Sequence, residues 1–377
     1  MMLSEDQAIL KDTFGRYFSN EMPIAKIRAL VDSGVNLDRG WWTATCELGA
    51  CSLLAPPELG GGGISGHPLV DLGLVATEVG RSLAPGPFIM SNLVIDALTR
   101  SPNSARHKAL VQALMSGESI VTWAHHEPRA PFDTCPKSVS VTAQGEQFLL
   151  SGIKNQVEYL CETDAFLVSA QGAGDVFQFL VSKDTPGLTI KPVECLDLNR
   201  SIGTVSFDRV ELAGDSIVSR GPAAIEAIAR QNLIVGALQC AEAIGCMERV
   251  FEFTLEWMFE RYSFGRPIAS YQALKHRMAD MKLWLEASIS VTEMALEAVD
   301  ADAPEAPELV SVAKAYVGEY STELIQEAVQ FHGGIGVTWE HDLHLYLRRS
   351  AFNRVTQGTP SDHRRRVTDI VEAKIRA

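Results

Sequence analysis

The sequence predicts an α+β protein, mostly helical, with an N-terminal helical domain, a middle β domain built as a small barrel or sandwich, and a C-terminal helical bundle. Three successive regions with different hydrophobic patterns along the 377 residues carry this prediction. Apolar residues recur at helical spacing up to about residue 117, short β-branched and aromatic runs follow up to about 218, and long helical segments occupy the rest. The expected domains are therefore 1–117, 118–218 and 219–377, because a chain of this length exceeds one simple core.

The N-terminal domain begins with a helix-start signal. Ser4 precedes acidic residues, and apolar residues recur at helical spacing between Ile9 and Phe18. Further helices are expected at about 25–33, 38–48, 69–81 and 105–116. A loop rich in glycine and proline at 55–66 interrupts them, and it is either a flexible connector or a loop that lies against a ligand.

The middle domain is predicted from short runs such as QFLLSG, FQFLVS and TVSFDRVEL. These runs carry β-branched and aromatic residues and are separated by Gly, Asp, Asn and Pro, and their spacing of ~8–12 residues is typical of small barrels and sandwiches. The expected strands lie at 119–124, 138–143, 147–152, 165–170, 177–182, 188–193 and 204–212.

The C-terminal region shows long helical periodicity with few breakers. Helices are expected at 223–261, 271–299, 307–331 and 340–354, and Pro307 suits the first turn of its helix because no amide donor is needed there. No internal repeat and no low-complexity tract accompanies them.

Composition excludes several classes of function. The net charge of −14 argues against a nucleic-acid partner and against an anionic membrane surface. No run of ~18 apolar residues exists, and the first residues are acidic and amphipathic rather than a secretory leader. Seven scattered cysteines without a C-x-x-C pair indicate reduced thiols and no zinc site, so we expect a cytoplasmic protein without a metal.

Two short motifs fail the tests for common sites. Gly333-Gly334-Ile335-Gly336 follows a predicted helix rather than a strand, so it does not indicate a dinucleotide-binding βαβ unit. His125-His126 is a lone pair at a strand end, which favours a solvent-facing or structural role over a metal site.

Two C-terminal segments remain open between a functional and a bland interpretation. Around 261–281 several basic residues gather where one helix ends and the next begins, which suits a phosphate or a solvated helix hairpin. Around 330–342 glycines follow a helix, which suits either a backbone lying against a planar group or a simple helix C-cap and turn.

These two segments resemble the acyl-CoA dehydrogenase family. The resemblance lies in R-x-x-F-G-x-P-I from Arg261, Q-A-x-K-H-R-x-A-D-M from Gln272, and Q-x-H-G-G-x-G-x-T-W-E-H-D from Gln330. It is most specific in the C-terminal half, and the order of helices, strands and helices extends it along nearly the whole chain. The family's fold has an N-terminal helical domain, a middle β domain and a C-terminal four-helix bundle that enclose FAD and an acyl-CoA.

The resemblance implies cofactor contacts for individual residues. Arg261 and Phe264 would contact the FAD of a neighbouring subunit, with Arg261 on its pyrophosphate. The residues expected near the adenosine end are Gln272, Gln330, Gly333 and Gly334. Thr359 would lie on the flavin side. A tetramer built as a dimer of dimers, an acyl-CoA substrate and an electron-transfer acceptor are implied with them.

The catalytic base that the family requires is missing from both of its usual positions. The reaction needs a carboxylate beside the α carbon of the substrate. Gln357 occupies the position before the Gly-Thr pair, and Val235 occupies the position twenty-nine residues before Phe264. The remaining candidate is Glu242, the only charged residue between Leu233 and Met247, which is either a relocated catalytic base or a structural carboxylate bonded to an arginine.

The β domain also departs from the family pattern. The family's T-E-P-x-A-G-S-D stretch has become His125-His126-Glu127-Pro128 followed by 129–133, and its W-x-T-N stretch has become 155–159. This pattern resembles the less conventional subunit of two-subunit actinobacterial enzymes that dehydrogenate steroid side-chain CoA thioesters.

Three functional hypotheses follow. The first is a subunit that completes the FAD site of a heterotetrameric acyl-CoA dehydrogenase whose partner supplies the base, with a bulky, steroid-like acyl group as substrate. The second is a self-sufficient homotetramer that uses Glu242. The third is a scaffold of the same fold that binds no FAD and catalyses nothing.

Overall fold

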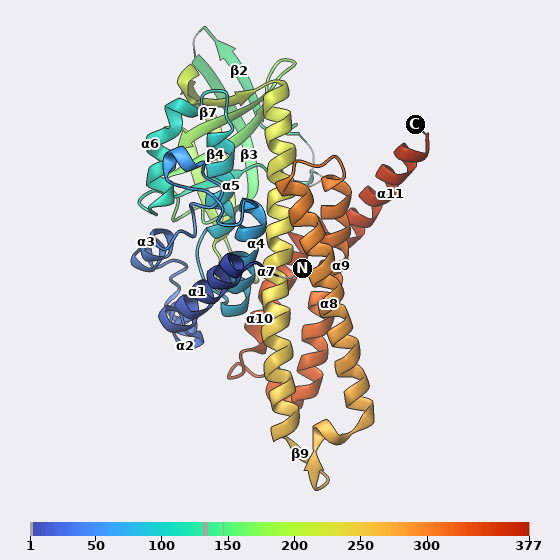
Figure 1. Ribbon diagram of the computed structural model, residues 1–377. Coiled ribbons are helices and arrows are strands. Elements are labelled where there is room, and N and C mark those ends of the chain that lie inside the picture. The colour runs from blue at the N-terminus through green and yellow to red at the C-terminus, as the bar shows by residue number, and fades with distance from the viewer. Residues whose placement is uncertain (1–2, 131–134, 146, 377) are drawn as a thin grey trace.

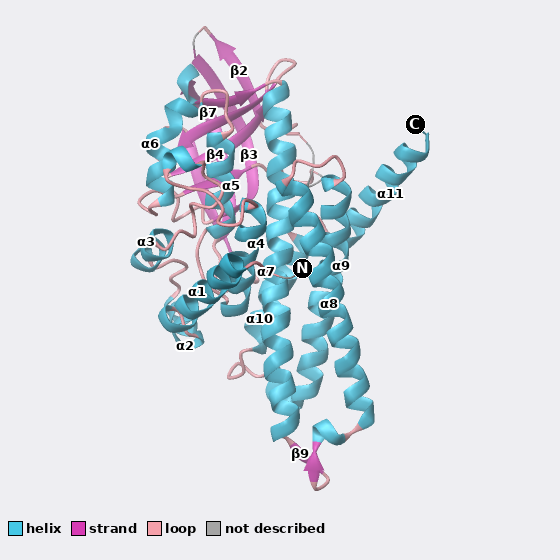
Figure 2. Cartoon of the chain, in the orientation of Figure 1, coloured by secondary structure: helices cyan, strands magenta, loops and turns pink. Residues whose placement is uncertain are grey.

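The computed structural model describes residues 3–130, 135–145 and 147–376. A helical layer, a β-sheet and a long helical bundle follow one another along the chain, and the sheet and the N-terminal helices lie on the same side of the bundle (Figures 1 and 2). The predicted fold class is therefore confirmed.

Six helices form the N-terminal layer. They are α1 (Glu5–Glu21), α2 (Ile24–Ser33), α3 (Arg39–Glu47), α4 (Pro68–Ser82), α5 (Phe88–Thr99) and α6 (Ser104–Met115). The predicted start at Ser4 is a capping box, because the Ser4 hydroxyl accepts a hydrogen bond from the Gln7 amide and the Gln7 side chain accepts one from Ser4. Helix α5 is buried along nearly its whole length, so it lacks the amphipathic pattern that would have marked it in the sequence.

The glycine-rich loop at 55–66 packs against its own chain. An added Cβ at Gly61 would lie 2.5 Å from the Ser52 carbonyl oxygen, and one at Gly63 would lie 2.6 Å from the Pro68 Cα. The Asp71 carboxylate also accepts a hydrogen bond from the amide of Ile64 (2.8 Å). Glycine at 61 and 63 therefore serves close internal packing, and the loop is anchored rather than a free connector.

The β domain is one eight-stranded sheet in the order β6-β7-β3-β2-β4-β5-β8, with β1 beside β4. The strands are β1 (Val121–Ala124), β2 (Ser140–Gln144), β3 (Gln147–Glu158), β4 (Ala165–Gln171), β5 (Val176–Ser182), β6 (Leu188–Val193), β7 (Ile202–Ala213) and β8 (Ile217–Arg220). A single parallel residue pair, Ser140 with Gln171, joins the two halves of the sheet between β2 and β4. Phenylalanine, valine and leucine side chains fill a separate core in this domain.

Long helices form the C-terminal bundle. They are α7 (Pro222–Glu260), α8 (Gln272–Asp300), α9 (Ala306–His332), α10 (Leu343–Val355) and α11 (Pro360–Arg376). A small hairpin of β9 (Tyr262–Ser263) and β10 (Arg266–Pro267) joins α7 to α8 at the far end from the sheet, and α11 leaves the bundle at an angle (Figure 1).

Two glycines let α4 cross α7 at very short distance. An added Cβ at Gly80 would overlap the Glu242 carbonyl oxygen, and one at Gly245 would overlap the Thr77 carbonyl oxygen. The N-terminal layer is therefore joined to the bundle by backbone packed on backbone.

The described residues form neither a helix suited to cross a membrane nor a cluster of metal ligands. The helices in this part of the chain include none that is both long and apolar enough to cross a bilayer. Among the residues with described positions, no three His, Cys, Asp or Glu side chains gather to hold a metal ion.

Candidate functional site

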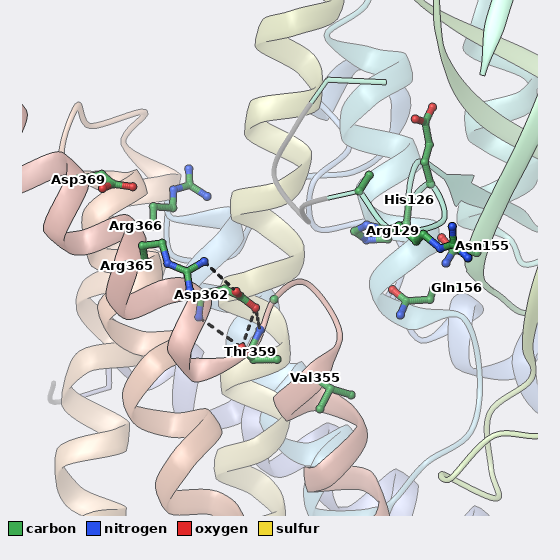
Figure 3. A pocket seen from close by; sticks show the side chains of 13 residues that line it. His126, Arg129, Asn155, Gln156, Val355, Thr359, Asp362, Arg365, Arg366 and Asp369 are labelled. Carbon is green, nitrogen blue, oxygen red and sulfur yellow. Dashed lines mark hydrogen bonds and ion pairs between the residues drawn. The ribbon is translucent and has the colours of Figure 1, made fainter. Parts of the chain in front are cut away.

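A cavity of about 700 Å³ lies between the β domain and the last two helices (Figure 3). His126, Arg129, Asn155 and Gln156 line the β side, and Thr359 lies among the residues on the helical side. The two walls come from segments about 200 residues apart in the sequence, so the cavity exists only because the bundle packs against the sheet.

The β wall is shaped by an irregularity in β3. The pairing register with β7 shifts between Lys154 and Val157, and Gln156 takes a left-handed φ of 52°. Asn155 and Gln156 lie at this bulge and line the cavity. The Asn155 amide donates to the His126 carbonyl (2.9 Å), which joins the bulge to the loop after β1. The Asn155 Oδ1 atom is buried and has no hydrogen-bond partner among the described residues.

A buried ion pair fixes the loop after β1. The Glu127 carboxylate accepts hydrogen bonds from the Ser138 amide (2.7 Å), the Val139 amide (3.0 Å) and the Lys154 ammonium (2.9 Å). Burial raises the pKa of Glu127, but Lys154 and the backbone amides outweigh it and lower the pKa to about 2. Glu127 is therefore a charged anchor of this wall.

The two histidines of the sequence pair play different roles. His125 is buried and stacks on Trp123 with ring centroids 4.6 Å apart, while its Nδ1 lies 2.7 Å from the Ser169 hydroxyl. His126 lines the cavity instead. Burial and the Lys154 charge lower the pKa of His126 to about 4 against an opposing contact with Gln357, so its ring is neutral at neutral pH.

The helical wall begins with a left-handed turn. Gln357 has a φ of 59° and Gly358 a φ of 94°, and the His363 Nε2 atom lies 2.8 Å from the Gln357 carbonyl oxygen. Thr359 follows as the N-cap of α11, and its amide (3.0 Å) and hydroxyl (2.6 Å) both donate to the Asp362 carboxylate in the first turn.

Arginines add positive charge to both walls of the cavity. Arg365 and Arg366 come from α11, and Arg129, which takes a left-handed φ of 64°, comes from the β side (Figure 3). Asp362 lies 3.7 Å from Arg365, so part of this charge is balanced within α11. The cavity therefore combines neutral amide, hydroxyl and imidazole groups with cationic groups at its rim.

The predicted cofactor residues fall into two separate groups. Thr359 lines the cavity. The other six lie at the opposite end of the bundle, on the β9–β10 hairpin, at the start of α8 and at the end of α9. Gln239, beside the cavity, and Arg261 are separated by 22 residues of α7, which is about 33 Å of helix.

Contacts join the helix ends that carry these six residues, which we call the far group. The Trp257 indole donates to the Phe331 carbonyl (3.2 Å) and stacks on His332 with ring centroids 5.2 Å apart, so the ends of α7 and α9 meet. The solvent-exposed members of this group are Arg261, Phe264, Gln272, Gln330, Gly333 and Gly334. Phe264 is 96% exposed at the tip of the hairpin, which is unusual for a phenylalanine in a monomer.

Glu242 lies inside a buried ionic cluster and not among the residues that line the cavity. Its two oxygens accept hydrogen bonds from Arg200 (2.6 Å each), and one of them also accepts from Arg349 (2.7 Å) and the other from Asn353 (2.9 Å). Burial raises the pKa of Glu242, but Arg200 and Arg349 outweigh it and hold the pKa below its ordinary value.

The cluster joins three parts of the fold. Arg200 also pairs with Glu158 of β3 (2.7 Å), and Arg349 of α10 also pairs with Asp197 of the β domain. Glu242 on α7 lies at the centre, so these charges hold the β domain against the bundle.

The sequence did not single out the β-wall residues of the cavity. His126, Asn155 and Gln156 stand where the sequence departs from the family pattern, and a departure gives no positive signal for a contact. Arg129, Arg365 and Arg366 were missed because a single arginine on a loop and a run of arginines on a polar helix look like ordinary surface charge.

Two family models match the chain. The model of the acyl-CoA dehydrogenase N-terminal domain matches residues 4–118, and the model of the acyl-CoA dehydrogenase C-terminal domain matches residues 227–371.

Curated relatives match over almost the whole chain. Acyl-CoA dehydrogenase IpdE2 of Mycobacterium tuberculosis is 30% identical over 351 residues, which cover 92% of this chain and 91% of that protein. Acyl-CoA dehydrogenase IpdE2 of Mycolicibacterium smegmatis is 27% identical over 366 residues, which cover 97% and 98%.

Solved structures share the fold. A variant of the Tcur3481-Tcur3483 steroid ACAD has a TM-score of 0.88 at 24% identity and covers 99% of both chains. The ChsE4-ChsE5 complex from Mycobacterium tuberculosis has a TM-score of 0.87 at 24% identity and covers 98% of both chains.

Proposed function

Because the chain belongs to the acyl-CoA dehydrogenase family, we propose that it is one subunit of an FAD-dependent enzyme that introduces an α,β double bond into an acyl-CoA thioester. Members of this family are flavin oxidoreductases that act on CH–CH bonds, and FAD, when bound, supplies the acceptor for the hydride that leaves the β carbon. The substrate that we propose carries a bulky, steroid-like acyl group, because one similar structure is a steroid ACAD. The electrons then pass to a separate electron-transfer acceptor.

The side chains of the cavity suit the flavin end of FAD. Its walls offer a hydroxyl at Thr359, amides at Asn155 and Gln156, and a neutral imidazole at His126. These uncharged donors and acceptors match the polar edge of a planar heteroaromatic ring. The buried and unpartnered Asn155 Oδ1 atom lacks a hydrogen-bond donor, which a ligand would supply.

The far group would serve a different copy of the cofactor. Arg261 supplies an exposed guanidinium that can bind a pyrophosphate, and Gly333 and Gly334 have no atom within 4 Å of an added Cβ, so a planar group can approach their backbone. A cofactor shared between subunits requires such a separation of contacts.

The single observation that carries the partner-dependent proposal is the environment of Glu242. A base must be free to accept a proton beside the α carbon. Glu242 already accepts hydrogen bonds from two arginines and an asparagine, and its depressed pKa opposes protonation. Since Gln357 and Val235 cannot accept the proton either, we propose that the base comes from a partner subunit.

The carboxylates that do line the cavity have other roles. Glu127 is held by Lys154 and backbone amides, and Asp362 accepts hydrogen bonds from Thr359, the N-cap of α11. Asp369 is exposed and lies two helical turns beyond Asp362. The self-sufficient homotetramer therefore remains as the alternative that requires Glu242 to leave its arginines, and the FAD-free scaffold as the alternative without chemistry.

The experiment is flavin bleaching by an acyl-CoA without oxygen. The chain should be purified alone and together with a second acyl-CoA dehydrogenase subunit from the same gene neighbourhood, each as wild type and as Glu242→Gln. We expect rapid bleaching only in the complex, and we expect the Glu242→Gln complex to stay within about tenfold of wild type, or 1.4 kcal/mol of barrier. Rapid bleaching by the isolated wild-type chain would refute the need for a partner, and protein that stays colourless in both forms would support the scaffold.

A further inference from the structure

Lys314 lies in the N-terminal third of α9 with its side chain deep inside the bundle, where it is 2% exposed. The ammonium donates three hydrogen bonds: to the Gln239 side-chain oxygen (3.0 Å), the Asn353 carbonyl (2.6 Å) and the Thr356 carbonyl (2.9 Å). All three donor positions of the amine are therefore used.

No carboxylate neutralises this charge within the part of the chain that the structure describes. Lys154, the other fully buried lysine, pairs with Glu127 at 2.9 Å, whereas Lys314 makes no such pair. Burial lowers the pKa of Lys314 to about 8, and the nearby buried thiol of Cys240 opposes this only in part. His363 is the other titratable group beside it, and the Lys314 charge helps to lower the His363 pKa.

The partial negative charge at the end of α10 takes the place of a carboxylate. The last carbonyls of a helix have no partner within the helix, and the helix dipole is negative there. The Asn353 and Thr356 carbonyls lie at this end of α10, and both point at the Lys314 ammonium. The lysine therefore acts as a C-terminal cap supplied by another helix.

This cap lies directly before the cavity wall. Thr356 is followed by Gln357, Gly358 and Thr359, of which the first two take left-handed backbone conformations. A non-glycine residue such as Gln357 adopts that conformation only when its surroundings hold it. Gln239 also holds Thr356, because its side-chain amide donates to the Thr356 hydroxyl (3.1 Å).

We propose that Lys314 is a positioning residue whose ammonium fixes the end of α10 and thereby the segment 357–359 that forms the helical wall of the cavity. A methionine would fill the same space without the cost of a buried charge. The hydrogen bonds to the two carbonyls therefore explain the lysine at this position. The consequence for FAD rests on the proposed function, whereas the positioning of the segment does not.

Hydrogen–deuterium exchange of the full chain tests the proposal without a cofactor. Lys314→Met should speed exchange of the amides in 357–363 at least tenfold. The matched control is Leu324→Ala, a change of a fully buried side chain that lies ten residues, or about 15 Å, further along the same helix. Both variants are compared at temperatures equally far below their own melting temperatures. Equal protection of 357–363 in the two variants would overturn the positioning role.

A second variant keeps the test decisive where Lys314→Met does not fold. Gln239→Met leaves the ammonium on its carbonyls but removes one acceptor and the donor to Thr356. It should speed exchange of the same amides by a smaller factor, and unchanged exchange would refute the proposal.

FAD affinity separates this inference from the proposed function. In the cofactor-loaded complex, Lys314→Met should weaken FAD binding and shift its visible absorption, while Leu324→Ala should leave both unchanged. If the segment loosens but wild type binds no FAD at all, the proposed function fails and the positioning role of Lys314 remains.

Discussion

Glu242 is a buried carboxylate whose surroundings fix its charge. Two arginines and an asparagine saturate its oxygens, and the strand and loop that supply Glu158 and Asp197 depend on the same arginines. An ion cluster of this kind stabilises a fold mainly by leaving no charge unpaired, because removing one partner exposes the others to an apolar interior. The position of Glu242 therefore favours a structural role over proton abstraction.

Replacing Glu242 with Gln should lower the free energy of unfolding by about 3 kcal/mol at neutral pH, because Arg200 and Arg349 lose their shared counter-charge. A carboxylate with a depressed pKa stabilises the fold above its unfolded pKa of about 4.3, and this contribution is lost as pH falls through the folded value. The difference between variant and wild type should therefore shrink below about pH 4. Urea unfolding at several pH values measures it.

Glu252→Gln is the matched control on the same helix. Glu252 is only partly buried and pairs with the partly exposed Arg81, so its loss should change stability by less than about 1 kcal/mol. Equal losses for the two variants at neutral pH would contradict the structural role of Glu242.

Sequence patterns predicted some residues of the candidate site and missed others. Thr359 was identified because it stands in a motif that the family shares, and the structure places it on the cavity. His126 and Asn155 line the same cavity, but they depend on a bulge in β3 and on a loop held by Glu127, which are tertiary features. Lys314 was missed because a lone lysine inside a helical pattern resembles a surface charge until its burial is known.

At the scale of elements, local periodicity located most helices but gave no bounds for α5 and α11. Helix α5 is apolar on all sides and therefore gives no stripe. In α11 apolar residues do recur at helical spacing, at Val367, Ile370, Val371 and Ile375, but few of its residues are buried, so this stripe does not mark a core helix. The predicted strands were found, but their order in the sheet was not, since pairing between β3 and β7 joins segments that local pattern does not relate.

The crossing of α4 and α7 makes two glycines indispensable. Gly80→Ala and Gly245→Ala should each lower stability by about 3 kcal/mol or more, because the added methyl group must displace a backbone carbonyl. Gly40→Ala, in α3, meets only the Asp38 side chain at 3.3 Å and should stay within about 1 kcal/mol of wild type. Thermal unfolding of the three variants compares them, and a mild effect at Gly80 would mean that the helices move apart easily.

The β9–β10 hairpin presents Arg261 to solvent in this chain, where its own fold gives it no ion pair among the described residues. Arg261→Ala should therefore leave stability unchanged but lower the flavin-to-protein ratio after desalting, because a guanidinium on a pyrophosphate is a charge-assisted contact. Arg266→Ala is the control on the same hairpin, since Arg266 stacks on Tyr271 of its own chain. Equal retention of flavin by both variants would place the pyrophosphate elsewhere.

At the scale of the whole molecule, the candidate cofactor contacts lie at two ends of one long bundle. The cavity holds Thr359, and the hairpin end holds Arg261, with about 33 Å of α7 between Gln239 and Arg261. Under the proposed function, one chain would offer two half-sites to two different cofactors, and each half-site would need a second chain to complete it. The assembly is a homotetramer if the second chain is another copy of this one, and a heterotetramer if it is a different subunit.

The flavin content of Arg261→Ala and Thr359→Val in the assembled protein distinguishes these two assemblies. In a homotetramer every cofactor meets Arg261 of one copy and Thr359 of another, so each variant alone should empty every site and the double variant should do no more. In a heterotetramer each cofactor meets only one of the two residues from this chain, because the partner supplies the opposite half-site. We expect the second outcome: each variant should remove only the flavin bound at its own end, and the losses should add in the double variant, as independent sites do. Complete loss of flavin from both single variants would contradict the heterotetramer, and it would favour the homotetramer that uses Glu242.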